Sequence, residues 1–187
     1  PDSKRFYGNA EEVSKANYAD YLTSLNLAAI DVQQKVKFGM VVRRTNMRTF
    51  PTDDKVYKTT ADNYLDRFQE TALFPTEVVA LLHESLDKKW FFAVSYNYAA
   101  WVKKSAVAIG NAEQIFDYKN RANFLLVTGN KIQTTFNPDN QNISELQLEM
   151  GTVLPLVDSK HIPKTLAGQN TYTSHVVLLP VREATGE

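Results

Sequence analysis

Residues 77–102 read EVVALLHESLDKKWFFAVSYNYAAWV, and this stretch decides the fold class. It contains three short apolar runs, at 77–83, 89–96 and 99–102, which are separated by polar turns. In the second run the side chains alternate between two faces, with Trp90 and Phe92 on one face and Phe91 on the other. Short alternating runs joined by tight turns predict antiparallel strands of a small barrel or sandwich.

The first 35 residues have a different pattern, which predicts a helical segment. Asn9 and Glu12 could cap a helix. Apolar side chains then recur at helical spacing, at Tyr18, Tyr21, Leu22 and Leu25. One apolar stripe on a short helix predicts docking onto a neighbouring element. From Val36 onward the sequence changes to short β-like runs.

A second set of β-like runs follows Gly110, at 124–128, 131–136, 146–157 and 171–181. Gly129 and Asn130 separate the first two of these runs, and glycine tolerates the positive φ of a tight turn, so a hairpin is predicted there. We therefore expect a mainly β fold with a helical N-terminal segment and two small barrels. The expected boundaries are 1–35 for the helical segment, 36–110 for the first barrel and 111–187 for the second.

Composition excludes several classes of function. Twenty-one Lys and Arg residues balance twenty-one Asp and Glu residues, so no net positive field exists to hold nucleic acid. The chain has no cysteine, which excludes disulfides, thiolate metal ligands and a cysteine nucleophile within these residues. No apolar run approaches the roughly 20 residues that span a bilayer, so we expect no membrane span.

Several pieces of the sequence occur in an order typical of one protein family. Residues 41–54 read VVRRTNMRTFPTDD, with Arg48 and Pro51 in an R-x-x-P pattern. An S-x-D-x-K-W pattern then spans 85–90, and a W-V pair follows at 101–102. This arrangement resembles the bacterial SH3-type domain that precedes the catalytic domain in NlpC/P60 cell-wall peptidases. The family's glycine before the W-V pair is replaced here by Ala99-Ala100.

The second β region is similar to the other SH3-like module of the same proteins. The likeness is carried by LLVTGNKI at 125–132 and MGTVLPLV at 150–157, and altogether it covers about residues 36–187. It implies the non-catalytic targeting, stabilising and substrate-restricting region of a periplasmic or secreted endopeptidase. That enzyme would cleave D-glutamyl-diamino acid bonds in peptidoglycan stem peptides. Its cysteine and histidine would come from a catalytic domain in the same protein or in a separate fragment.

A second hypothesis comes from another class of protein. The chain could be a free-standing SH3-like adaptor that binds cell-wall glycan or peptide, or a protein partner. The run at 176–181, followed by the polar residues 182–187, is typical of a strand that leads into a linker, which favours a truncated peptidase over an adaptor.

Candidate contact residues lie in one loop and beside one hairpin. By the resemblance, the long loop after the first strand walls off the substrate site, so the expected contacts with stem peptide or catalytic domain are Arg44, Asn46, Arg48 and Asp53. The alternative is a solvated loop whose charges pair with each other. Tyr96 and Tyr98 flank a turn and are expected to be exposed, where they could bind sugar or peptide. Trp90 and Trp101 are expected in the core.

An enzyme contained within the chain is not supported. No G-x-S-x-G motif or glycine-rich phosphate loop is present, and His83, His161 and His175 have no metal-ligand spacing. We therefore predict no catalytic residue, no metal and no cofactor. Two substitutions are predicted to have different effects on stability. Arg48→Ala should weaken a contact and leave folding nearly intact, whereas Trp90→Ala should cost about 3–5 kcal/mol of stability.

Overall fold

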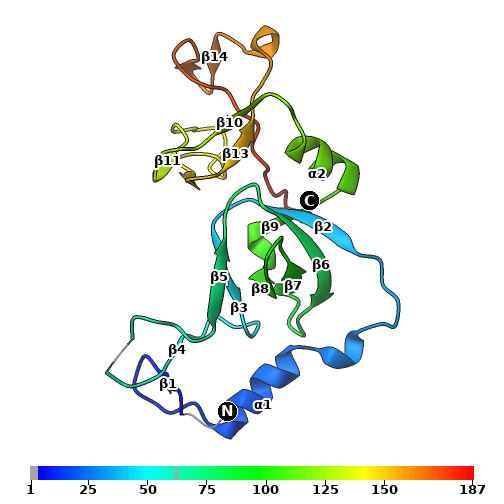
Figure 1. Ribbon diagram of the computed structural model, residues 1–187, viewed down its shortest axis with the longest axis vertical. Helices are drawn as coiled ribbons and strands as arrows, with labels where there is room; N and C mark the ends of the chain where they lie inside the picture. The colour runs from blue at the N-terminus through cyan, green and yellow to red at the C-terminus, as the bar shows by residue number, and fades with distance from the viewer. Residues whose placement is uncertain (1–3, 62) are drawn as a thin grey trace. The chain divides into compact units, whose positions relative to one another are not determined.

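The computed structural model describes residues 4–61 and 63–187 (Figure 1). The fold is mainly β with one helix near the N-terminus, as the sequence predicts. The chain divides into two compact units. Unit 1 comprises Pro1–Val36, Thr45–Leu73 and Val79–Ser105, and unit 2 comprises Lys37–Arg44, Phe74–Val78 and Ala106–Glu187.

Unit 1 begins with β1 (Phe6–Tyr7), α1 (Lys15–Ser24) and the 3-10 turn η1 (Leu27–Ala29). The predicted cap at Asn9 and Glu12 is wrong. Asn9 instead closes a turn by accepting a hydrogen bond from the Glu11 N–H at 3.1 Å. The helix is capped by Ser14, whose hydroxyl accepts from the Asn17 N–H while the Asn17 side chain accepts from the Ser14 N–H. This reciprocal pair satisfies two backbone donors, as in a capping box.

The predicted docking of the helix is confirmed, chiefly through Tyr21. The Tyr21 ring is buried and stacks on Phe50 with centroids 5.4 Å apart, and it meets Phe68 edge-on at 5.2 Å. Its hydroxyl donates to Asp54 Oδ2 at 2.5 Å. Leu22, on the expected stripe, is 57% exposed and takes no part in this core. Helix α1 is therefore held by an aromatic cluster that also holds the segment carrying Phe50 and Asp54.

The antiparallel meander predicted from residues 77–102 is present in unit 1. Its strands lie in the order β5-β3-β8-β7-β6 (Figure 1). Their bounds are β3 (Thr45–Arg48), β5 (Gln69–Leu73), β6 (Val78–Glu84), β7 (Trp90–Val94) and β8 (Ala99–Lys103). A short strand β4 (Val56–Tyr57) pairs with β1, and the 3-10 turn η2 (Lys104–Ala106) follows β8. Trp90 and Trp101 are 4% and 3% exposed, so both belong to the core, as predicted.

The S-x-D-x-K-W residues close the turn between β6 and β7. The Ser85 hydroxyl donates to Asp87 Oδ1 at 2.6 Å and accepts from the Trp90 N–H at 3.1 Å. Asp87 Oδ1 also accepts from the Lys89 N–H at 3.0 Å. Burial acts to raise the pKa of Asp87, but the hydrogen bonds from Ser85 and Lys89 outweigh it, so the pKa lies below its ordinary value of 3.8.

Replacing Asp87 tests this turn through the pH dependence of stability. A carboxyl whose pKa is lower in the folded state stabilises the fold above its unfolded pKa, and that contribution is lost as the pH falls through the folded pKa. Asp87→Asn keeps an acceptor oxygen but removes the charge. We expect a smaller loss of stability between about pH 7 and about pH 2.5 than in the parent, measured by urea denaturation. Asp20→Asn, on exposed helix surface, is the control; an equal effect of both substitutions would contradict the assignment.

Unit 2 consists of short paired strands and one helix. Its elements are β2 (Lys37–Val41), β9 (Val107–Gly110), α2 (Ala112–Lys119), β10 (Phe124–Leu126), β11 (Lys131–Gln133), β12 (Gln147–Glu149), β13 (Val153–Pro155), the 3-10 turn η3 (Ser159–His161), β14 (Thr165–Leu166) and β15 (Gln169–Asn170). Strand β2 pairs with β9, β10 with β13, β11 with β12 and β14 with β15, all antiparallel. Val127 after β10, Leu148 of β12 and Leu154 of β13 form a buried cluster.

Two predictions for this region are wrong, the hairpin at Gly129-Asn130 and the strand at 171–181, and one helix was not predicted. The runs on either side of Gly129-Asn130 do not pair with each other, because β10 pairs with β13 and β11 pairs with β12. Residues 112–119 form a helix, capped by the Asn111 side chain, which accepts from the Glu113 N–H. The run at 171–181 is not a strand; it contributes only an isolated bridge from Val177 to Leu156. The second SH3-like barrel stays a prediction.

No helix in the described part of the chain combines the length and apolar character needed to cross a bilayer.

Candidate ligand-binding surface

The loop after β3 is held from beneath by Arg48, whose side chain is buried. Its Nη1 contacts Asp66 Oδ2 at 2.8 Å, and its Nη2 donates to the Asp54 carbonyl. Asp66 Oδ1 in turn accepts from the backbone N–H groups of Val56 and Phe68 at 3.2 and 3.0 Å. One buried ion pair therefore ties together β3, the loop and the segment that leads into β5.

This burial changes the interpretation of Arg48. Its relative exposure is 4%, so its guanidinium does not reach a ligand at the surface. The same burial changes the prediction for Arg48→Ala: a buried carboxylate would lose its partner, so we expect the substitution to lower stability and not to leave folding nearly intact. Arg48 instead fixes the position of the loop that carries Asp53 and Asp54.

Asp53 lies at the surface of this loop and pairs with a lysine. Its side chain is 71% exposed, and its Oδ1 lies 2.6 Å from Lys103 Nζ at the end of β8. Lys103 Nζ also sits 5.5 Å from the centroid of the Trp90 ring. The pair presents one negative and one positive group to solvent, and the tryptophan beneath restrains the lysine.

Tyr98 forms a second polar group with residues that sequence reasoning missed. Its hydroxyl donates to Glu70 Oε2 at 2.6 Å, and the Thr49 hydroxyl donates to Glu70 Oε1 at 2.5 Å. The bond to Glu70 raises the pKa of the Tyr98 hydroxyl. Tyr96, across the same turn, is 86% exposed. The predicted exposure of both tyrosines is confirmed, and Glu70 and Lys103 join them as candidate contacts.

The remaining two predicted contacts are placed elsewhere. Asn46 is half-buried on β3, opposite Ala72 of β5. Arg44 belongs to unit 2, where its exposed guanidinium lies 4.0 Å from Glu149 Oε1 and 5.7 Å from the centroid of the Phe74 ring. The six predicted residues thus divide into four surface positions, Arg44, Asp53, Tyr96 and Tyr98, one half-buried position and one buried position.

His83 has a structural role, because its ring contacts backbone carbonyl groups. Its Nε2 lies 3.0 Å from the carbonyl oxygens of both Leu25 and Asn26, so the ring ties β6 to the end of the helical segment. Across residues 4–61 and 63–187, no group of three or more His, Asp or Glu side chains could hold a metal ion.

Comparison with known proteins identifies the class of domain first. Residues 55–103 match the SH3 domain family of the SH3b1 type, a range that covers β4 through β8. The chain therefore contains an SH3b domain, and the aligned range includes Glu70, Tyr96, Tyr98 and Lys103.

A solved structure has a similar fold along almost the whole chain. It is described as a novel NlpC/P60 endopeptidase from Photobacterium damselae subsp. piscicida, with a TM-score of 0.74 and 21% sequence identity. The match covers 99% of this chain and 38% of that one, so the chain spans well under half the length of that protein. No curated protein matches the sequence. The resemblance to the SH3-like region of NlpC/P60-type proteins is confirmed.

Proposed function

We propose that the chain is the non-catalytic region of a peptidoglycan endopeptidase of the NlpC/P60 type, which targets and stabilises the catalytic domain and restricts its substrates. The observation that carries the proposal is the SH3b domain at 55–103 within a fold that follows such an endopeptidase along 99% of this chain. The absence of cysteine agrees with a role outside the catalytic step. The catalytic domain would be its main partner, in the same protein or as a separate fragment.

The surface of the SH3b domain suits a charged peptide ligand. Lys103 offers an ammonium group for a carboxylate, and Asp53 and Glu70 offer carboxylates for an amine. A stem peptide with a diamino acid carries both kinds of group. Tyr96, at the turn between β7 and β8, adds an exposed aromatic ring. This combination supports binding of stem peptide at the surface formed by Asp53, Glu70, Tyr96, Tyr98 and Lys103.

The buried Arg48–Asp66 pair would make this surface rigid. A loop fixed in advance binds with a smaller loss of conformational freedom than a mobile loop does. It would also act as a fixed wall that admits short stem peptides and excludes larger ones. The proposed substrate bond is the one between D-glutamate and the diamino acid, and the proposed location is the periplasm or the cell exterior. Arg44 and Asn46 remain proposed contacts with the catalytic domain.

Lys103→Met tests the peptide contact. Methionine keeps an unbranched side chain over Trp90 but removes the ammonium group and leaves Asp53 without its partner. We expect the dissociation constant for the tripeptide L-alanyl-D-glutamyl-diaminopimelate to rise about tenfold in titration calorimetry, since a hydrogen bond to a charged group contributes about 1.5–3 kcal/mol.

The matched control is Lys131→Met, which removes an exposed lysine of β11 in unit 2. It should bind the tripeptide as the parent does. Equal affinity of the Lys103→Met variant and the parent would remove this surface from the proposal.

A further inference from the structure

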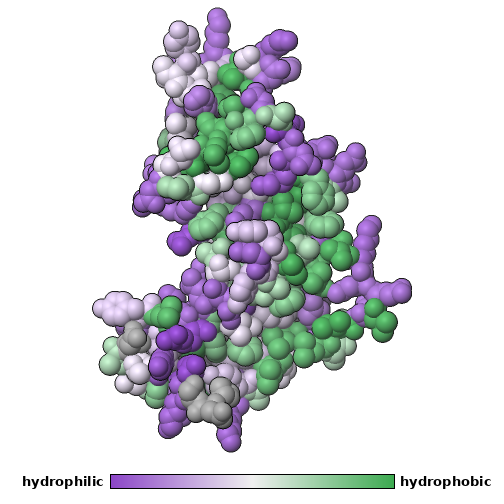
Figure 2. Space-filling view, viewed as in Figure 1, coloured by the Kyte–Doolittle hydropathy of each residue, from purple (hydrophilic) through white to green (hydrophobic). Residues whose placement is uncertain are grey.

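Unit 2 contains a pocket of about 330 Å³ that none of the sequence motifs indicated. Its apolar lining includes the core residues Leu148 and Leu154 together with Leu179 and Leu166. Figure 2 shows apolar side chains gathered in the part of unit 2 that carries β10, β11 and β14, with polar side chains around them. Small-molecule sites typically occupy about 300–1,000 Å³ and combine apolar walls with a few placed polar groups.

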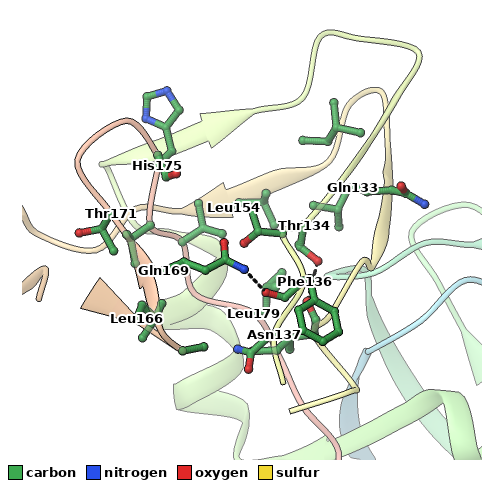
Figure 3. A pocket seen from close by; sticks show the side chains of 18 of the residues that line it. Gln133, Thr134, Phe136, Asn137, Leu154, Leu166, Gln169, Thr171, His175 and Leu179 are labelled. Carbon is green, nitrogen blue, oxygen red and sulfur yellow. Dashed lines mark hydrogen bonds between the residues drawn. The ribbon is translucent and has the colours of Figure 1, made fainter. Parts of the chain in front are cut away.

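Four amide side chains line this pocket, those of Gln133, Asn137, Gln169 and Asn170. Internal hydrogen bonds hold the side chains of Asn137 and Gln169 (Figure 3). Gln169 Nε2 donates to the Phe136 carbonyl at 2.7 Å, which leaves its Oε1 as an acceptor. Asn137 Oδ1 accepts from the N–H groups of Asp139 and Asn140 at 2.9 and 3.1 Å, which leaves its Nδ2 as a donor. Among residues 4–61 and 63–187, neither of these remaining groups has a hydrogen-bond partner within the protein.

The hairpin that carries Gln169 has a defined conformation. Leu166 of β14 and Gln169 of β15 lie opposite each other in the ladder. Between them, Ala167 and Gly168 both have positive φ, at 48° and 76°. A two-residue hairpin turn with both central residues in this region belongs to type I′, which fits the twist of the flanking strands. The backbone therefore positions the Gln169 amide at the pocket.

The lining contains no Asp, Glu, Lys or Arg side chain. A ligand with ionised groups would lose its hydration without gaining an opposite charge, which is unfavourable. The free donor and acceptor instead match the C=O and N–H of a single secondary amide. The leucine side chains match an apolar group such as a methyl beside that amide.

The exposed residues at the rim of the pocket favour a ligand in which the amide group is attached to a sugar and not to a peptide. The Phe136 ring lines the pocket and is 58% exposed, which suits packing against the C–H face of a pyranose. Ser174 and His175 also line the pocket, are exposed and have no side-chain hydrogen bond among the described residues. They are available to sugar hydroxyl groups.

We infer that this pocket binds an uncharged N-acetylated hexosamine unit of a glycan, with the acetamido group between Asn137 and Gln169. The site lies outside residues 55–103 and uses none of the residues proposed to hold the stem peptide. It extends the proposed function, because the SH3b domain would bind the peptide and unit 2 would bind the sugar.

The test is titration of the full chain with the linear trimer of N-acetylglucosamine, compared with cellotriose, which has a hydroxyl in place of each acetamido group. We expect the N-acetylated trimer to bind and cellotriose to bind at least about tenfold more weakly. This comparison needs no altered protein. Equal binding of the two trimers, or no binding of either, would overturn the inference, and so would tighter binding of an uncharged N-acetylated dipeptide amide.

Asn137→Asp provides the matched variant. An aspartate keeps the oxygen that accepts from Asp139 and Asn140 but replaces the free donor with a carboxylate oxygen. The affinity for the N-acetylated trimer should fall about tenfold or more at an unchanged thermal midpoint. Asn142→Asp adds the same charge to an exposed residue outside the pocket lining and should bind as the parent does. Unchanged affinity of the Asn137→Asp variant would contradict the assignment.

Failure of this inference is distinguishable from failure of the proposed function. Loss of trimer binding with tripeptide binding retained would reject only the sugar pocket. Trimer binding without tripeptide binding would reject the proposed peptide surface and leave the pocket assignment intact.

Discussion

Arg48→Ala is expected to lower the free energy of unfolding by about 3–5 kcal/mol. The substitution leaves Asp66 buried without its 2.8 Å ion-pair partner and removes the donor to the Asp54 carbonyl. The loop would lose its support on both sides. Urea denaturation followed by circular dichroism measures the change directly.

The control for Arg48 is Arg44→Ala, which removes an exposed arginine from the same stretch of sequence. Its ion pair with Glu149 spans 4.0 Å, and such surface pairs contribute about 0–1 kcal/mol. We expect the two variants to differ by more than about 2 kcal/mol. Similar stabilities of the two variants would show that Arg48 is not the support of the loop.

Trp90→Ala is expected to cost about 3–5 kcal/mol, because it removes a large ring from a fully enclosed site. Trp90 is 4% exposed, and its backbone N–H is held by the Ser85 hydroxyl at 3.1 Å. It also lies beneath Lys103, so the substitution would remove the apolar support of the Asp53–Lys103 pair. The variant should therefore lose stability and tripeptide affinity together.

Tyr96→Ala is the matched control for Trp90. Tyr96 has the same alternation phase in the sequence but is 86% exposed, so its removal should change stability by less than about 0.5 kcal/mol. Comparison of the denaturation midpoints of the Trp90→Ala and Tyr96→Ala variants shows which of the two side chains belongs to the core. A small effect of Trp90→Ala would place the ring outside the core and contradict the packing described above.

Features set by local pattern were predictable from the sequence. The meander of unit 1 follows from alternation and short turns, and the exposure of Tyr96 and Tyr98 follows from their position beside a turn. The docking of α1 follows from the spacing of its tyrosines. In each case the deciding residues lie within a few positions of one another, where side-chain periodicity has physical meaning.

Features set by distant partners were not predictable from the same patterns. Arg48 lies in a charged stretch that reads as a solvated loop, but its partner Asp66 is supplied by a segment beyond β4. Glu70 joins Tyr98 only because β5 and β8 flank β3 in the sheet. The pairing of β10 with β13 likewise overrides the local hairpin signal at Gly129-Asn130. Local sequence spacing does not predict these contacts, because the residues are far apart in the chain and come together only in the folded structure.

We propose that this chain binds the bacterial cell wall without catalysing its cleavage. The most direct measurement is co-sedimentation of the purified chain with purified peptidoglycan sacculi, followed by analysis of the soluble fraction for released muropeptides. We expect the chain to pellet with the sacculi and to release no muropeptide. A chain that stays in the supernatant at every sacculus concentration, or one that releases muropeptides by itself, would contradict it.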